Sequence, residues 1–489
     1  MTRSPSHRLR RGLAGLVLAL LLPAMAACGT APATGDTIFT GGMSLAEEKR
    51  LGSEQHPKIL QQFGGAYDDP ELTDYVASIG RLLAQTSELP QLDWTFTVLD
   101  TPIVNAFALP GGYVYVSRGL LALAENEAQL AGVMAHEIGH VTARHSAERY
   151  GSSQIAGLAT VLSGVLLGRT GAQVTSGLSQ VALSSYSRGQ ELEADTLGVR
   201  YLSRAGYDPQ AMATFLAKLQ ANSRLEATLA GNPDAADDFS LLQTHPRTAD
   251  RVQQAIRAAD TKPVQDPMLA RDVYLPKLAG MIYGHSPAQG FVRGQRFLHP
   301  ELRFAFEVPR GFRLLNGTTQ VTARGPGGSA IVFDRASGQA AGDVASYLVD
   351  TWAKGARLAR VERITVNGLP GATALAQART DAGARTVRLA AIRYDSETIY
   401  RFLFLHPQRG DLSAAFQDTL GSFRKLGAAE AAELEPYRVR LYTVQPGDSV
   451  QDLAARLPYP DHRELRFRVL NGLDDGQTLE AGRTVKLVQ

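Results

Sequence analysis

The sequence predicts a multidomain protein, in which a mainly α-helical domain with a small β-sheet precedes an α+β domain and a small C-terminal module. The chain has 489 residues, which exceeds what one hydrophobic core usually supports. Apolar residues follow a mostly helical spacing from Ser44 to about Asp260, whereas short alternating segments typical of strands begin after Gly290. An Ala/Glu-rich linker, Gly427 to Glu435, precedes the last segment.

The N-terminus predicts an export signal. A basic stretch ends at Arg11, an apolar run follows, and small residues precede Cys28, the only cysteine. The segment from Met25 to Cys28 resembles a bacterial lipobox, with Met in place of the usual Leu. This resemblance implies that Cys28 is acylated and anchors the chain to the outer membrane; ordinary cleavage near Ala27 is the alternative. A single cysteine excludes a disulfide within the mature chain.

The charge balance gives no reason to expect a nucleic acid as partner. Of the 50 basic residues, four lie in the leader, which leaves 46 against 48 acidic residues. A chain so close to neutrality lacks the positive field that nucleic acid binding requires.

Within the helical domain two short strands are expected. They are Trp94 to Leu99 and Tyr113 to Val116, and the turn Pro110-Gly111-Gly112 precedes the second. In the later domain a helix is expected from Asp343 to Lys354. The clearest strands there are Phe304 to Val308, Ala330 to Phe333, Val387 to Ile392 and Ile399 to Phe404.

The strongest chemical motif is the segment His136-Glu137-Ile138-Gly139-His140. Residues four apart lie one helical turn apart, so His136 and His140 present their imidazoles from one face, as a zinc site requires. Glu137 follows the first histidine by about 100° of helical rotation, which places its carboxylate beside the open coordination position. Asn126 is a suitable N-cap for this helix.

Two alternatives concern the third ligand and the class of metallopeptidase. His145 is nine positions from His136, about 180° around a continuous helix, so we expect it to face away as a surface or second-layer residue. The metzincin class requires Gly and His at set offsets, where this chain has Ala143 and Ser146, and is excluded.

The third ligand is predicted downstream, on a second helical segment. Glu191 and Asp195 share a face at i and i+4. Glu191 completes a two-His, one-Glu site for one Zn²⁺ per chain, and Asp195 is expected to hold a ligand imidazole in the right tautomer. For Glu193 we expect a solvated helix face.

Three motifs in order, Asn105 to Gly112, His136 to His140 and Glu191 to Asp195, resemble the BepA/HtpX/CAAX-prenyl-protease family, and most closely its BepA-type periplasmic branch. The resemblance covers about Ser44 to Ala259. It implies a gluzincin fold of the zincin type and a zinc metalloendopeptidase that acts on proteins or peptides. It also implies that the strand after Gly112 is the edge that pairs with an extended substrate.

The same resemblance includes His245 and Arg251, which are similar to a histidine and a downstream arginine late in BepA-type domains. It implies that His245 reaches the metal and acts as a latency switch; a plain loop histidine is the alternative. BepA-type chains continue into helical repeats, whereas this chain continues into strands. Residues 155–177 are expected to be a helical insertion that packs over the cleft as a lid, or simply joins the core.

The last residues resemble a LysM module, which implies a βααβ fold and binding to peptidoglycan through residues 438–489. The middle domain is faintly similar to PsbP-like folds. The predicted domains are a signal peptide at 1–28, a flexible tether at 29–43, the metallopeptidase at 44–260, a connector at 261–290, an α+β domain at 291–426, a linker at 427–437 and the LysM-like module at 438–489.

Two functions follow from these expectations. The first is an envelope endopeptidase for quality control of misfolded or misassembled periplasmic and outer-membrane proteins. The second is a latent protease that works mainly as a chaperone or peptidoglycan-binding scaffold lipoprotein. Glu137 favours the enzyme, because a scaffold has no need for a carboxylate that activates water.

Overall fold

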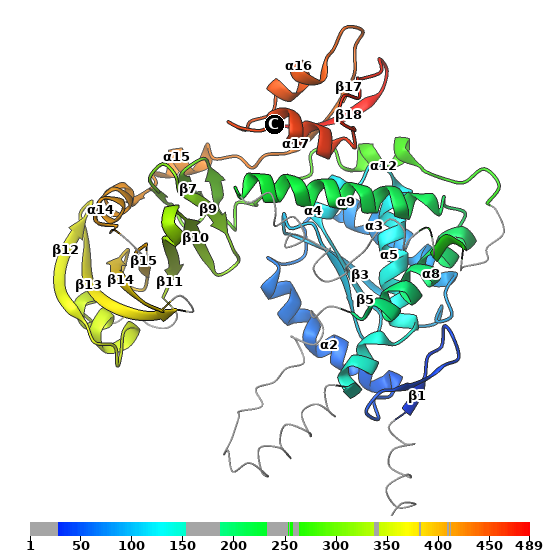
Figure 1. Cartoon of the computed structure of the whole chain (residues 1–489), viewed down its shortest axis with the longest axis horizontal. Coiled ribbons are helices and arrows are strands. Elements are labelled where there is room, and N and C mark those ends of the chain that lie inside the picture. The colour runs from blue at the N-terminus through cyan, green and yellow to red at the C-terminus, as the bar shows by residue number, and fades with distance from the viewer. Residues whose placement is uncertain are drawn as a thin grey trace, which may run out of the picture. The chain divides into compact units, whose positions relative to one another are not determined.

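A computed structural model describes residues 28–152, 186–231, 253, 255–257, 264–336, 342–380, 383–407, 410 and 412–489. The chain forms two compact units (Figure 1). The first unit combines the residues up to Met281 with Val439–Gln489, and the second is Ile282–Arg438. The C-terminal module, predicted as a separate domain, therefore belongs to the same compact unit as the helical domain.

The first unit opens with a β-hairpin where a flexible tether was predicted. Strands β1 (Cys28–Thr30) and β2 (Thr37–Phe39) pair antiparallel, with Cys28 opposite Phe39. The hairpin loop is held by a hydrogen bond from the backbone N of Ala33 to the Thr142 carbonyl oxygen, 3.2 Å away. The polar, Gly-containing composition suggested a linker, but these backbone bonds give the segment a defined conformation.

Two helices and a small sheet follow. Helix α2 (Leu45–Gln62) starts at a capping box in which Ser44 and Glu47 satisfy each other's backbone N–H groups. Helix α3 (Pro70–Gln85) starts at the N-cap Asp69. The sheet has the strand order β3 (Thr95–Leu99), β5 (Tyr113–Ser117) and β4 (Ala106–Leu109).

This strand order corrects the expectation that the strand after Gly112 is an edge. Strand β5 is the middle strand, parallel to β3 and antiparallel to β4. Gly111 and Gly112 have φ values of +82° and +91°, which lets the chain fold back tightly and lay β4 against the side of β5 that was expected to be free. The edge on that side of the sheet is therefore β4.

Helix α5 (Glu127–Thr142) lies at the centre of the first unit, where it packs against α3, the sheet, α8 (Arg188–Arg204) and α9 (Gln210–Leu229) (Figure 1). Its N-cap is Asn126, as predicted. The crossing with α8 is very close. A Cβ on Gly139 would lie 3.0 Å from the Ala194 carbonyl oxygen, and one on Gly198 would lie 3.1 Å from the backbone N of His136.

Helix α5 ends sooner than the sequence pattern suggested. After the C-cap Ala143, Arg144 has φ +57°, a left-handed conformation that is uncommon for a side chain of this size. The Arg144 guanidinium pairs with buried Glu48 at 2.6 Å and donates to the Met43 carbonyl oxygen at 2.6 Å. These buried contacts compensate the strain, and a new helical segment begins at His145.

The second unit is built from two antiparallel sheets. The seven-stranded sheet has the order β12 (Ala359–Val366), β13 (Leu369–Thr380), β14 (Gly383–Arg393), β15 (Ile399–Leu405), β11 (Ala330–Arg335), β10 (Gln320–Arg324), β9 (Arg313–Asn316). The four-stranded sheet has the order β16 (Arg424–Lys425), β8 (Phe304–Glu307), β7 (Arg296–His299), β6 (Phe291–Arg293). Their shared core is aromatic, with Phe304 and Phe306 packed on Phe333.

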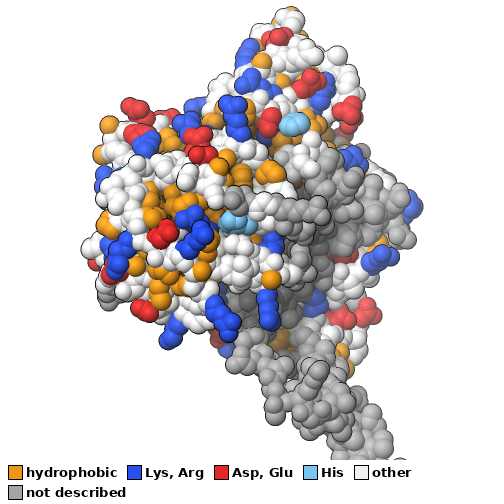
Figure 2. Space-filling model, turned by 60° about the vertical axis from the view of Figure 1, so that its left-hand side comes forward, with side chains coloured by type: hydrophobic (Ala, Val, Ile, Leu, Met, Phe, Trp, Pro, Cys, Tyr) orange, Lys and Arg blue, Asp and Glu red, His pale blue; other side chains and the backbone are white. Residues whose placement is uncertain are grey.

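The predicted strands of this unit are all present, and the predicted helix is a short turn of α13 (Val344–Ser346) continued by a π-helical segment, Tyr347–Trp352. Helix α14 (Ser413–Ser422) lies beside β8. Basic and acidic side chains are interspersed over the face that Figure 2 shows, in agreement with the near-neutral composition.

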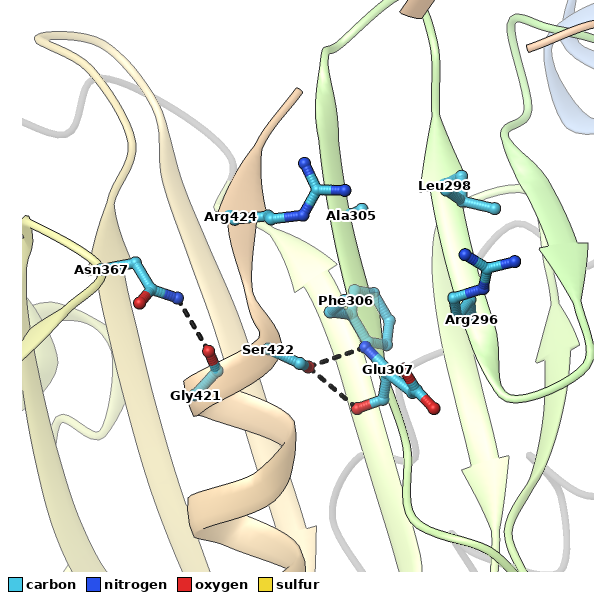
Figure 3. A pocket seen from close by; sticks show the side chains of 9 residues that line it. All are labelled: Arg296, Leu298, Ala305, Phe306, Glu307, Asn367, Gly421, Ser422 and Arg424. Atoms are coloured by element: carbon cyan, nitrogen blue, oxygen red, sulfur yellow. Dashed lines mark hydrogen bonds between the residues drawn. The ribbon is translucent and has the colours of Figure 1, made fainter. Parts of the chain in front are cut away.

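A pocket of about 630 Å³ lies on the four-stranded sheet of this unit (Figure 3). It is lined by Arg296, Leu298, Ala305, Phe306, Glu307, Asn367, Gly421, Ser422 and Arg424. Ser422 Oγ accepts from the Glu307 backbone N at 2.7 Å, and Asn367 Nδ2 donates to the Gly421 carbonyl oxygen at 2.8 Å. These side chains hold the strands and α14 together, and the lining contains neither His nor Cys, so it offers no soft metal ligand.

The C-terminal module returns the chain to the first unit. Its order is β17 (Val439–Thr443), α16 (Val450–Ala455), α17 (Arg463–Leu470), β18 (Thr484–Val488), with β17 and β18 antiparallel. This is the expected βααβ order; the LysM assignment itself stays a prediction. Helix α17 packs against α9 and against α4 (Arg118–Leu123), the helix just before α5.

A buried group of charges joins this module to the start of α5. Lys486 of β18 is fully buried; its Nζ donates to the carbonyl oxygens of Ala122 at 2.8 Å and Ala124 at 2.7 Å and pairs with Glu125 at 2.8 Å. Lys218 of α9 pairs with the same carboxylate. Burial by itself raises the pKa of Glu125, but the two ammonium groups together outweigh it and hold that pKa well below its usual range.

Replacing Lys486 with Met should destabilise the first unit by about 2 to 3 kcal/mol, because the α4 carbonyls lose their donor and Glu125 loses a buried partner. Trp94 lies in the first unit and Trp352 in the second, and the chain has two Trp. Urea unfolding followed by Trp94 fluorescence in a Trp352→Phe background measures the first unit alone. Arg440→Met, an exposed change in the same module, is the control, and equal midpoints for both variants would contradict a stabilising role.

Candidate metal centre

The two histidines of the motif meet inside the first unit. His136 and His140 are 0% and 1% exposed, and their Nε2 atoms lie 3.0 Å apart. Helix α5 is buried along nearly its whole length, which places both imidazoles in the protein interior. A buried imidazole cannot form hydrogen bonds with water, and leaving its polar nitrogen atoms without a partner costs free energy.

Glu191 of α8 completes the group. Its Oε1 lies 3.3 Å from His140 Nε2, and its Oε2 lies 3.7 Å from His136 Nε2. The three residues form a buried cluster whose ligand atoms all lie within 4.8 Å of one another. The structure therefore brings together the three predicted ligands, and Glu191 comes from a second helix, as expected.

These distances fit a tetrahedral zinc ion. Ligand atoms that are each about 2.0 to 2.1 Å from a shared ion lie about 3.3 Å from one another in a tetrahedron. The two Nε2 atoms, 3.0 Å apart, and the pair His140 Nε2 and Glu191 Oε1, 3.3 Å apart, are close to that value. The other carboxylate oxygen, Oε2, lies 3.7 Å from His136 Nε2. Two imidazoles and one carboxylate are also the donor set of catalytic zinc sites that keep a fourth position open for water.

Both ligand histidines have a partner on the ring nitrogen that faces away from the cluster. Asp195 Oδ1 lies 2.8 Å from His136 Nδ1, and both side chains are fully buried. A carboxylate in this position fixes the tautomer, because His136 carries its proton on Nδ1 and leaves Nε2 free for a metal.

His145 is the corresponding partner of His140, and this corrects the expectation that it faces away. The Nδ1 atoms of the two histidines lie 2.8 Å apart, and His145 is 2% exposed. The expectation assumed that α5 continues through His145, whereas α5 ends at Thr142 and the left-handed Arg144 redirects the chain. His145 is thus a second-layer residue, one of the two alternatives, and not a surface one.

Glu193 is also more than a solvated carboxylate. Its Oε2 lies 3.3 Å from His145 Nε2, and its side chain is 34% exposed. The helical spacing of α8 predicted that Glu193 points away from Glu191. It could not predict that His145 contacts the Glu193 carboxylate.

Tyr186 was missed by the sequence analysis. It precedes the N-cap Ser187 of α8, and its ring stacks on the His140 ring with a centroid separation of 3.7 Å and an angle of 14°. The Arg149 guanidinium lies 3.7 Å from the centroid of the same Tyr186 ring. Burial raises the pKa of Tyr186, so it stays a neutral phenol. No local sequence pattern marks this stacking, since it joins two segments far apart in the chain.

The electrostatics of the site favour metal binding. Burial lowers the pKa of His140, and neighbouring His136 lowers it further, so the imidazole is neutral at neutral pH. A neutral imidazole is the form that binds a metal. Glu137, Glu191 and Asp195 are each 0% exposed, and a divalent cation supplies positive charge that offsets the burial of these carboxylates.

A helix with two histidines four residues apart, together with a glutamate from a second helix, defines a metallopeptidase-type centre. Residues 70–259 match the model of peptidase family M48. This part of the chain is therefore a peptidase M48 domain.

Among the curated proteins to which the chain is similar are two peptidases. The chain is 30% identical over 280 residues to the beta-barrel assembly-enhancing protease of Escherichia coli (strain K12), which is 53% of this chain and 55% of that protein. It is 31% identical over 216 residues to the mitochondrial metalloendopeptidase OMA1 of Schizosaccharomyces pombe (strain 972 / ATCC 24843), which is 43% of this chain and 61% of that protein. The chain thus spans a little over half the length of these relatives.

The solved structures with detectable similarity include a PsbP protein. The solution structure of cyanobacterial PsbP from Synechocystis sp. PCC 6803 matches with 15% identity and a TM-score of 0.22, and the match covers 28% of this chain and 98% of that one. The PsbP-like expectation for the middle domain stays a prediction.

Several predicted features lie outside the described residues. These are the signal peptide up to Ala27, the segment 155–177, and the residues His245 and Arg251. Among the helices that the structure describes, none combines the length and the hydropathy needed to cross a membrane.

The purified chain should hold one zinc ion, and His136→Ala and Glu191→Ala should each lose it, because each removes one of three protein ligands. Elemental analysis after dialysis against a weak chelator measures the stoichiometry. His462→Asn, a change at an exposed histidine of the C-terminal module, should keep full occupancy. One equivalent of zinc in both ligand variants would place the metal elsewhere.

Proposed function

We propose that this protein is a zinc-dependent endopeptidase. The observation that carries the proposal is the buried cluster of His136, His140 and Glu191, with Glu137 next to the first ligand on the same helix. The chemical class agrees with the M48 domain and with the names of both relatives.

A zinc ion held by these residues would polarise the scissile carbonyl group and lower the pKa of a water molecule. Glu137 then acts as the general base and takes a proton from the attacking water. The same carboxylate delivers that proton to the nitrogen of the leaving amine, which completes peptide bond hydrolysis. Asp195 and His145 hold the Nδ1 sides of His136 and His140, so both Nε2 atoms stay directed at the metal position.

The substrate is a protein or peptide in extended conformation. Strand β4 is the outer strand on one side of the sheet and packs against α5, the helix that carries the motif. An extended segment that added to β4, the outer strand on this side of the described sheet, would run beside the candidate metal centre. Backbone hydrogen bonds of this kind recognise any sequence, which suits a protease for misfolded chains.

We place this activity in the bacterial cell envelope, as quality control of misfolded or misassembled periplasmic and outer-membrane proteins. Support comes from the predicted export signal, the lipobox-like segment before Cys28 and a relative named for enhancing β-barrel assembly. Acylated Cys28 would anchor the chain to outer-membrane lipid, and residues 438–489 would bind peptidoglycan. In the alternative scaffold role these last two contacts would be the main function.

Glu137→Gln should keep its zinc and lose peptidase activity by at least about 100-fold, because the amide cannot act as a base although its shape is preserved. A quenched-fluorescence casein assay measures the rate, and Glu54→Gln, an exposed change on α2, is the control. Turnover that persists in Glu137→Gln would remove this residue from the mechanism. Full function of the same variant in cells would favour the scaffold role.

Membrane attachment through Cys28 is the second expectation, because this solitary cysteine lies exposed at the start of β1. Cys28→Ser should leave the membrane fraction and lose label from radioactive palmitate. Gly29 follows Cys28 in place of the Asp that often retains bacterial lipoproteins in the inner membrane, so the wild type should fractionate with the outer membrane. Equal membrane recovery of both chains without label in either would contradict lipidation.

His245→Ala should raise the basal proteolytic rate, since an imidazole at the open metal position would keep water out until a substrate displaces it. Rate and melting temperature are measured together. A latency switch predicts a faster rate at nearly constant melting temperature. A variant that is both slower and less stable would show that His245 only anchors its segment.

A further inference from the structure

The second metal-ligand histidine is oriented by a chain of side chains that the motif does not contain. His140 Nδ1 lies 2.8 Å from His145 Nδ1, and His145 Nε2 lies 3.3 Å from Glu193 Oε2. The three residues come from α5, from the helical segment that begins at His145, and from α8. His140 and His145 are both almost completely buried.

The short contact between two ring nitrogens requires a single proton between them. Two unprotonated nitrogens would repel, and two N–H groups would clash. One histidine therefore donates from Nδ1 and the other accepts at Nδ1.

The direction of that bond decides whether His140 can bind a metal. If His140 donates, its proton is on Nδ1, and its Nε2 lone pair faces His136 and Glu191. If His145 donates, neutral His140 must carry its own proton on Nε2, where it would block the metal position. Only the first arrangement is competent for ligation.

Glu193 selects the competent arrangement. When His145 accepts at Nδ1, its proton is on Nε2, where the Glu193 carboxylate can accept it. When His145 donates from Nδ1, its Nε2 carries a lone pair that would face the carboxylate oxygen. That second arrangement is repulsive, so Glu193 favours the tautomer of His145 that keeps Nε2 of His140 free.

We propose that His145 and Glu193 are positioning residues for the metal ligand His140, and that they fix its tautomer and its ring orientation. Tyr186, stacked on the His140 ring, holds the plane of the ring, while His145 holds its edge. The proposal deepens the zinc site of the proposed function and rests on it. Asp195 contacts Nδ1 of the other ligand, His136, so each ligand imidazole has a separate partner on its Nδ1 side.

The test compares two variants of His145 whose new side chains are nearly equal in shape. In His145→Asn the side-chain oxygen can take the place of Nδ1 and accept from His140, whereas His145→Leu has the same shape and no acceptor. The zinc dissociation constant is measured by competition with a chromophoric chelator. His145→Leu should weaken zinc binding about 10- to 100-fold, and His145→Asn should recover most of that loss.

A second pair tests the outer residue. Glu193→Leu should weaken zinc binding by a few-fold, because the exposed fraction of Glu193 lets water replace part of the acceptor. Glu193→Gln keeps an acceptor oxygen and should bind as the wild type does. Melting temperatures of the zinc-free proteins are recorded for every variant. A purely structural role would lower the melting temperature, but the zinc affinity would not depend on whether the new side chain has an acceptor atom.

The outcomes separate the two proposals. A wild-type chain that binds no zinc would overturn the proposed function itself. A wild type that binds zinc, with Leu and Asn at position 145 equal to it, would overturn only the positioning role. If His145→Leu does not fold, the Glu193 pair decides, and equal affinity of Glu193→Leu and Glu193→Gln would contradict the proposal.

Discussion

The close crossing of α5 and α8 is the contact on which the rest of the site depends. Gly139 and Gly198 face the partner helix, where a Cβ atom would lie 3.0 to 3.1 Å from its backbone. A Cβ atom at either position would force the neighbouring helix to move by a few tenths of an ångström. Because the helices meet so closely, a glutamate 51 positions after His140 in the chain reaches the same point as two histidines of α5.

This arrangement is costly before any metal binds. It buries three carboxylates and two imidazoles in one region, and an isolated buried charge costs several kcal/mol. The outer ring of partners limits that cost and orients the ligands. Asp195 and His145 each contact one ligand imidazole on the side that faces away from the metal position. These three carboxylates and two imidazoles therefore form a buried group that could hold a cation.

The sequence predicted the part of this design that is periodic or local. The motif on α5, the N-cap Asn126 and the i, i+4 pair on α8 all follow from helical spacing, and the strands of the second unit follow from alternation. The features that the sequence did not predict depend on changes of chain direction, and no local sequence pattern marks these changes. The left-handed Arg144 is held by buried Glu48, 96 residues away, so neither the end of α5 nor the inward position of His145 was visible. The central position of β5 required knowing that the preceding motif is itself a strand.

The central claim is that His136, His140 and Glu191 hold a zinc ion. Anomalous diffraction from crystals of the purified chain, recorded on both sides of the zinc absorption edge, locates the metal directly. The account predicts one peak about 2.0 to 2.2 Å from His136 Nε2, His140 Nε2 and an oxygen of Glu191. A fully occupied zinc peak at any other place in the chain, with none at this cluster, would contradict it.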